Sequence, residues 1–169
     1  MRVLRSMVFL GAFAAILPAG PAQAEEEFPL AINVRQMHME TALAAARAAL
    51  AACRAEGIQV GVTVVDRRGI EQVVLRDVVA PHLTLEVSRM KAYTANEMTV
   101  ATSALEEGGH RSPLAHVPGL FLGAGGVPIE AGGVFYGAIG VSGAPSGLQD
   151  EACARAGAEA VEIELEMNL

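Results

Sequence analysis

The chain has 169 residues, of which 12 are basic and 19 acidic, and its formal net charge is −7. This length suits one domain with a single core. The negative charge disfavours nucleic acid and anionic membrane surfaces as partners, because both repel an acidic protein.

The first 24 residues have the pattern of a cleaved signal peptide. Two arginines precede an apolar run over residues 7–17, and AQA at 22–24 is a small-x-small cleavage motif. The run has about half of the roughly 20 apolar residues that a membrane helix needs. We therefore expect a periplasmic or secreted protein with no stable membrane insertion, in which residues 25–169 form one domain. Cleavage removes two basic residues and no acid, so the mature charge is 10 − 19 = −9.

The segment 33–57 predicts a first helix. Asn33 is a suitable N-cap, and Gly57 is a suitable residue to end the helix. Between them, apolar side chains recur every three or four residues and form one stripe: Met39, Leu43, Ala46, Leu50 and Cys53.

Residues 58–66 and 70–77 predict two strands of a β-hairpin. Both segments are rich in β-branched side chains, and the turn between them contains Gly69. Antiparallel pairing follows, because parallel neighbours need a crossover of a dozen residues or more.

From Pro81 the hydrophobic period becomes helical and continues to about residue 105. The stripe that we expect to face the core consists of Leu83, Val87, Met90, Thr94, Met98, Ala101 and Leu105. A loop follows, then two strands around Gly132 and Gly133, and a last helix over 148–167. This order of elements predicts an α+β domain with helices packed on an antiparallel sheet.

Cys53 and Cys153 each fall in a predicted amphipathic helix. In an oxidising compartment they could form a disulfide, whereas buried thiols are also ordinary small core residues. The sequence leaves both alternatives open, and the spacing excludes a CxxC redox or zinc motif.

Several other sequence patterns do not indicate a functional site. Asp150 and Glu151 lie near the start of the last helix, where negative charge complements the helix dipole. Asp66 and Asp77 end the first two strands, and nothing in the sequence fixes their separation. The stretch GAGGVP at 123–128 resembles a dinucleotide fingerprint, but a strand follows it where a helix is required.

Five blocks occur together and in order: VTVVDRRG, SRMKAYTA, GGVPI, GAIGVSGA and QDEACARAG. In this combination the chain resembles the GlcG/HbpS family of small haem-binding proteins, also called the DUF336 or haem-degrading domain. The resemblance implies a profilin-like sheet covered by helices, assembly into a homo-oligomer, and binding of haem or a related tetrapyrrole. The chain departs from the family pattern at 77–80, where DVVA replaces the usual DGA.

His82 is the leading candidate for a haem-iron ligand. It follows Pro81, which suits the first position of a helix, and the positive end of the helix dipole opposes the imidazolium form. Neutral imidazole is the form that binds haem iron. The alternative is a helix-end histidine that is hydrogen-bonded to the loop.

Three further residues are candidates for cofactor binding. His38 borders the apolar stripe of the first helix, and His116 lies in a loop that could fold over a ligand. Lys91 matches a position of the family and could hold a haem propionate, although a helical lysine is usually solvated.

The leading interpretation is a secreted haem-binding or tetrapyrrole-binding protein with an accessory role in haem handling or redox sensing. Two alternatives stay open. The chain could be an enzyme that degrades bound haem, or a module that binds a partner protein without a cofactor.

Overall fold

The computed structural model describes residues 28–169, apart from the side chain of His110. The signal peptide expected at 1–24 lies outside the described residues. Residues 34–169 form one unit with these elements: α1 (Met39–Ala55), β1 (Gly61–Asp66), β2 (Glu71–Arg76), α2 (Leu83–Met98), η1 (Thr102–Leu105), η2 (Gly109–Arg111), η3 (Pro113–His116), β3 (Gly126–Ala131), β4 (Val134–Ser142) and α3 (Gly147–Met167).

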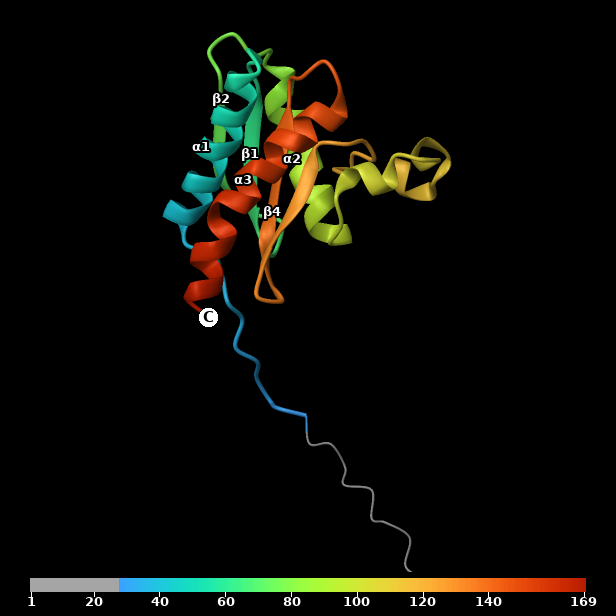
Figure 1. Ribbon diagram of the computed structural model, residues 1–169. Helices are drawn as coiled ribbons and strands as arrows, with labels where there is room; N and C mark the ends of the chain where they lie inside the picture. The colour runs from blue at the N-terminus through green and yellow to red at the C-terminus, as the bar shows by residue number, and fades with distance from the viewer. Residues whose placement is uncertain (1–27) are drawn as a thin grey trace, which may run out of the picture. The chain divides into compact units, whose positions relative to one another are not determined.

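The four strands form one antiparallel sheet in the order β2-β1-β4-β3. This arrangement confirms the predicted α+β class and both predicted hairpins. The second hairpin turns at Gly132 and Gly133, whose φ angles of 54° and 76° are those of a tight turn that favours glycine. Helices α1 and α3 lie side by side over one face of the sheet, and α2 lies on the other (Figure 1).

The α1/α3 face of the sheet carries the main hydrophobic core. Val62 and Val64 of β1, with Ile139 and Val141 of β4, point toward the two helices and are fully buried. The helices also pack closely against each other, because α3 presents Gly157 where a Cβ would lie 2.7 Å from the carbonyl oxygen of Ala45.

A disulfide joins the two helices on this face. Cys53 of α1 and Cys153 of α3 have their Sγ atoms 2.10 Å apart and their Cα atoms 5.5 Å apart. Of the two alternatives that the sequence leaves open, the structure therefore shows the disulfide. The bond closes a loop across 100 residues of sequence, and a loop of that length stabilises the folded state by about 4.7 kcal/mol in the chain-entropy estimate.

The α2 face is built from small residues. A Cβ at Gly140 would lie 2.2 Å from the carbonyl oxygen of Ser88, and one at Gly126 would lie 2.3 Å from that of Lys91. Thr63 of β1 also shares a hydrogen bond of 2.9 Å with the Ser88 hydroxyl. The helix backbone therefore lies almost directly on the strand backbones.

Most of the predicted core stripe of the second helix is wrong for this reason, since of its members within α2 only Thr94 is buried. Leu83 is 64% exposed, and Val87, Met90 and Met98 are only partly buried. The residues that face the sheet are small or polar, because larger side chains do not fit against glycine-rich strands: Thr84, Ser88, Lys91, Ala92 and Ala95.

Two predicted helix ends also differ from the structure. The first helix begins at Met39, with His38 rather than Asn33 as its N-cap. The second ends at Met98, because Thr99 takes a left-handed conformation with φ 53°, and residues 102–105 form η1 instead. Within residues 28–169 no helix is both long and apolar enough to span a membrane.

Candidate functional site

Lys91 lies at the centre of the most connected polar cluster. Its side chain is 4% exposed, and its Nζ atom donates to Asp150 Oδ2 at 2.8 Å and to the Val141 carbonyl oxygen at 3.1 Å. The same atom lies 5.6 Å from the centroid of the Phe121 ring, within the range of a cation–π contact. Lys91 is therefore a buried, paired lysine and not a solvated one.

Asp150 stands in the first turn of α3 and is also buried. Its Oδ1 atom accepts a hydrogen bond of 2.9 Å from the Ala144 backbone N–H. Burial raises the pKa of Asp150 above its usual value, although the Lys91 hydrogen bond and the Ala144 N–H act in the opposite direction. The helix dipole alone does not account for this residue, because its main partner is the lysine of another helix.

Glu151, the next residue, fixes the segment between α2 and β3. Its carboxylate accepts hydrogen bonds from the Ser103 hydroxyl at 2.7 Å and backbone N–H at 3.0 Å, and from the Gly125 N–H at 3.3 Å. Two threonine hydroxyls hold the same segment. Thr102 accepts from the Gly126 N–H, and Thr94 accepts from the Phe121 N–H.

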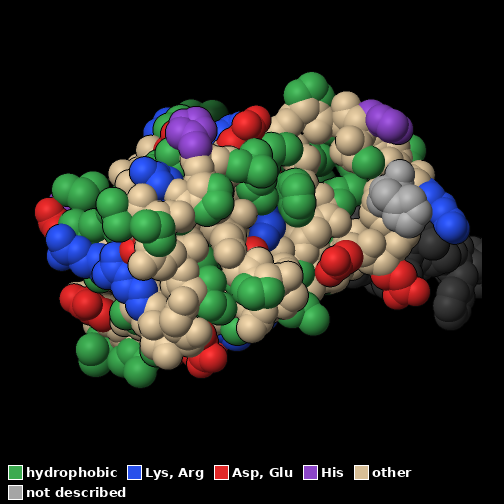
Figure 2. Space-filling model, turned by 90° about the horizontal axis from the view of Figure 1, so that it is seen from above, with side chains coloured by type: hydrophobic (Ala, Val, Ile, Leu, Met, Phe, Trp, Pro, Cys, Tyr) green, Lys and Arg blue, Asp and Glu red, His purple; other side chains and the backbone are tan. Residues whose placement is uncertain are grey.

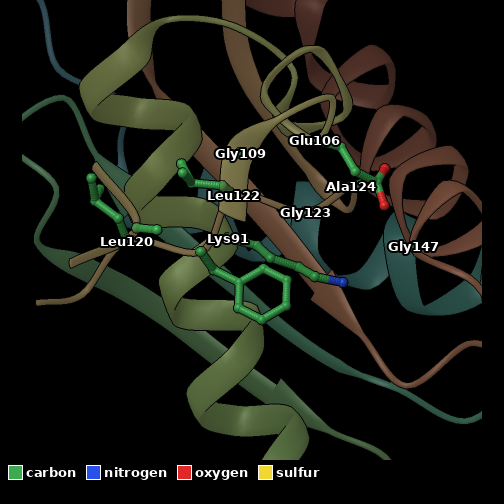
Figure 3. A pocket seen from close by; sticks show the side chains of 10 residues that line it. Lys91, Glu106, Gly109, Leu120, Leu122, Gly123, Ala124 and Gly147 are labelled. Atoms are coloured by element: carbon green, nitrogen blue, oxygen red, sulfur yellow. The ribbon is translucent and has the colours of Figure 1, made fainter. Parts of the chain in front are cut away.

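A pocket of about 540 Å³ opens between this segment, α2 and the start of α3. The Lys91 side chain runs from α2 toward Gly147 at the start of α3, whereas the Leu120 and Leu122 side chains lie away from its amino end (Figure 3). The view from above shows a basic side chain recessed among hydrophobic ones (Figure 2). The apolar lining consists of Ala115, Leu120, Phe121, Leu122 and Ala124, with Lys91 and Glu106 as the charged lining residues.

Four of the five family-like sequence blocks meet at this pocket and its ion pair. SRMKAYTA supplies Lys91, and QDEACARAG supplies Asp150 and Glu151. GAIGVSGA supplies the Val141 carbonyl, and GGVPI supplies Gly125, where a Cβ would lie 2.6 Å from Lys91 Nζ. The blocks are thus the parts of one three-dimensional unit.

His82 lies elsewhere, as the N-cap of α2. Its side chain is exposed and makes no capping hydrogen bond. It is flanked by three strongly exposed apolar residues, Val78 at 85%, Val79 at 70% and Leu83 at 64%. The structure therefore presents a free imidazole in an apolar surface segment, and its role as an iron ligand stays a prediction.

The other candidate histidines are not brought to His82 or to each other. His38 lines a separate pocket of about 280 Å³ with Arg35 and Tyr136, and its Nδ1 atom accepts the Glu40 N–H at 3.3 Å. An accepting Nδ1 places the ring proton on Nε2, so iron binding through Nε2 would break this cap. His116 is exposed at the end of η3, next to Ala115 of the Lys91 pocket. In the view from above, histidine side chains stand at separate places on the surface (Figure 2).

Asp66 and Asp77 do not form a carboxylate pair, because they lie at opposite ends of the first hairpin. Asp66 accepts the backbone N–H groups of Arg68 and Ile70 and closes the turn. Asp77 binds the Arg54 guanidinium and the Val60 N–H, which ties the end of α1 to the sheet. Both carboxylates are thus engaged in structural contacts.

Sequence reasoning missed the pairing of Lys91 with Asp150. Both residues belong to blocks that carry the family resemblance, SRMKAYTA and QDEACARAG. These blocks are far apart in the sequence, so their pattern does not indicate that the two side chains are in contact. Among residues 28–169, no three His, Cys, Asp or Glu side chains gather as a metal site, although a single axial ligand to haem requires no such group.

Several proteins of known structure have a similar architecture. The chain is similar to the crystal structure of HbpS, with 38% sequence identity, a TM-score of 0.74, and coverage of 82% of this chain and 99% of that one. A double mutant of Streptomyces reticuli HbpS gives 37% identity, a TM-score of 0.74 and coverage of 85% and 99%. A PduOC:haem complex gives 27% identity, a TM-score of 0.69 and coverage of 75% and 95%. No curated protein matches the chain significantly. The sequence model of one family, described as haem degrading protein HbpS-like, matches residues 37–159, and the chain belongs to this family.

Proposed function

We propose that this protein binds haem, with His82 as the axial ligand of the iron. The observation that carries the assignment to this residue is the free imidazole of His82 within an exposed apolar segment. Membership of a family described by haem degradation, and similarity to a protein crystallised with haem, support the choice of cofactor.

The residues around His82 fit the needs of a haem. The macrocycle requires an apolar surface beside its axial ligand, and three strongly exposed apolar residues, Val78, Val79 and Leu83, lie within four positions of His82 in the sequence. Arg76 donates through Nη1 to the carbonyl oxygens of residues 77, 78 and 80, and its remaining N–H groups are available for a propionate. Bound haem would supply an iron centre able to change its oxidation state.

The Lys91 pocket fits haem less well. Among the residues whose side chains the structure describes, no histidine lines it, and Glu106 would lie near any propionate. Lys91 is already bonded to Asp150, so recruiting it for a propionate would break a buried ion pair. We therefore place the haem at the His82 surface.

An exposed surface covers only one side of a flat cofactor. A second copy of the chain would cover the other side, so the proposal includes a homo-oligomer with haem at or near a subunit contact. Strongly exposed apolar side chains such as those of Val78, Val79 and Leu83 are typical of such contacts when they gather on one surface.

A hemin titration tests this function. Purified residues 25–169 should shift the Soret band with saturation at a fixed ratio of haem to subunit, and His82→Ala should remove most of the shift. His38→Ala and His116→Ala are matched controls that should keep it. An unchanged shift in His82→Ala would contradict the ligand assignment, and no shift in the wild type would contradict haem binding.

We also propose that the protein is exported, with residues 1–24 removed, and acts as an accessory in haem handling. The Cys53–Cys153 disulfide supports export, because such bonds persist in oxidising compartments. N-terminal sequencing of the protein from a periplasmic extract should begin at Glu25. A mature protein that retains residues 1–24 in the cytoplasm would contradict export.

A further inference from the structure

The pocket at Lys91 has a chemistry of its own, which does not depend on haem binding. Its volume of about 540 Å³ lies within the range of small-molecule sites. Its apolar walls include Phe121, which is 37% exposed at the surface, and its floor holds a charged group. This combination of apolar walls with a few fixed polar groups is typical of a ligand site.

The floor offers one hydrogen-bond donor. An ammonium has three N–H groups, and Lys91 uses one on Asp150 and one on the Val141 carbonyl. None of the described residues accepts a hydrogen bond from the third. Lys91 lines the pocket, and its Nζ atom lies 5.6 Å from the centroid of the Phe121 ring, so a ligand oxygen beside that ring would complete its set of partners.

The charges of the pocket select a neutral ligand. Asp150 already balances the Lys91 charge, and Glu106, the other charged lining residue, is acidic. A carboxylate would therefore be repelled by Glu106, and an ammonium has no lone pair with which to accept a hydrogen bond from Lys91. A carbonyl or amide oxygen can accept from Lys91 without either penalty.

The pocket is held in its shape before any ligand arrives. Glu151, Thr102 and Thr94 fix the covering segment through hydrogen bonds to Ser103, Gly126 and Phe121. A Cβ at Gly123 would lie 2.7 Å from the Phe121 ring, and one at Gly147 would lie 2.7 Å from the Ala124 carbonyl oxygen. Such preorganisation lowers the entropy cost of binding.

We propose that this pocket is a second binding site, separate from the His82 surface, for a neutral and largely apolar small molecule whose carbonyl oxygen accepts a hydrogen bond from Lys91. Phe121, Leu120 and Leu122 hold the apolar part of the ligand.

Fluorine NMR with matched probes tests the site. The probes are 4-fluoroacetophenone, 1-ethyl-4-fluorobenzene of similar shape without the oxygen, 4-fluorobenzoate and 4-fluorobenzylamine. The ketone should bind with a dissociation constant of roughly a millimolar, as expected for about ten heavy atoms. It should bind about tenfold or more tightly than the hydrocarbon, the usual effect of a hydrogen bond to a charged donor, and more tightly than either charged probe.

Two variants locate the binding. Ala115→Trp fills the pocket from its exposed rim and should abolish ketone binding, while Val117→Trp, outside the lining, should leave it unchanged. The double variant Lys91→Met with Asp150→Asn removes both charges and should reduce the preference for the ketone over the hydrocarbon to about one.

The outcomes separate this site from the haem site. Equal binding of ketone and hydrocarbon by the wild type, or ketone binding that survives Ala115→Trp, would overturn the proposal. Loss of the hemin Soret shift in Ala115→Trp, with displacement of the ketone by hemin, would also overturn it, because the pocket would then be the haem site. Failure of His82→Ala to affect hemin would leave the ketone result intact.

Discussion

The two faces of the sheet are stabilised in different ways. On the α1/α3 face, branched aliphatic side chains fill the space and a disulfide joins the helices. On the α2 face, glycines bring the helix backbone onto the strands, and the other contacts combine a small apolar cluster of Val65, Ala92, Ala95 and Ala138 with polar contacts such as the Lys91–Asp150 pair. The volume of hydrophobic side chains therefore sets how the helices pack on the first face. Close approach of the backbones and hydrogen-bond geometry set how α2 packs on the second. Both candidate sites belong to the α2 side of the molecule.

The largest effect should come from adding volume to the α2 face. Gly140→Val would place side-chain carbon about 2.2 Å from the Ser88 carbonyl oxygen, so the helix must move away from the sheet. We expect a loss of about 4 kcal/mol or more in the free energy of unfolding, or no folded protein. Ile139→Val, at the adjacent position on the other face, should cost only about 1 kcal/mol. Urea unfolding compares the two, and equal costs would contradict the difference between the faces.

The disulfide should be the next largest contribution, and it acts on the α1/α3 face. Cys53→Ala with Cys153→Ala should lower the free energy of unfolding by about 4 kcal/mol, chiefly because the unfolded chain gains freedom. The double variant should still retain the ketone site, since its hydrogen bonds lie on other residues. Thermal unfolding with and without reductant measures the effect. A wild type whose disulfide is reduced but whose melting temperature does not fall would contradict it.

The coupling between Lys91 and Asp150 should be clearest in the free energy of unfolding of a variant that lacks only one of the two charges. Lys91→Met leaves Asp150 buried without its cation, and we expect a loss of about 3 kcal/mol in the free energy of unfolding. Adding Asp150→Asn should restore a large part of that loss, because the uncompensated charge disappears. A double variant no more stable than Lys91→Met would show that the two residues are not coupled.

Local sequence patterns encode most of the elements of this fold but not the contacts between distant elements. Both hairpins, the last helix and the α+β class follow from β-branched runs, glycine turns and helical periodicity, and the structure confirms them. The orientation of α2 did not follow, because its apolar stripe is the usual signal of a core face and only the glycines opposite it reverse that rule. The Lys91–Asp150 contact spans 59 residues, and no local pattern encodes such a distance.

Asp150 should also make stability depend on pH. Its pKa in the folded state is raised, chiefly by burial, so the folded state binds more protons than the unfolded state between the unfolded value near 3.8 and the folded value. The stability contributed by this carboxyl is therefore present at low pH and is lost as pH rises through that window. Relative to Asp150→Asn, the wild type should gain free energy of unfolding as pH falls toward about 4. Denaturant titrations from pH 7 to 4 measure this difference, and a constant difference would contradict it.

The smallest effect should come from the exposed end of α2. Leu83 is 64% exposed, so Leu83→Gln should change the free energy of unfolding of the isolated subunit by no more than about 0.5 kcal/mol. A comparable change at Val64, which is fully buried on the other face, should cost several times as much. A large loss for Leu83→Gln in the monomer would show that the stripe is a core after all.

The proposed haem site depends on one atom, the His82 ring nitrogen that would bind the iron. His82→Gly would leave a space at the N-cap of α2 that free imidazole can occupy. His82→Gly should lose the Soret shift of bound hemin, and millimolar imidazole should restore it, whereas His38→Gly and His116→Gly should keep the shift and should not respond to imidazole. A His82→Gly protein that keeps the wild-type spectrum before imidazole is added would contradict the assignment.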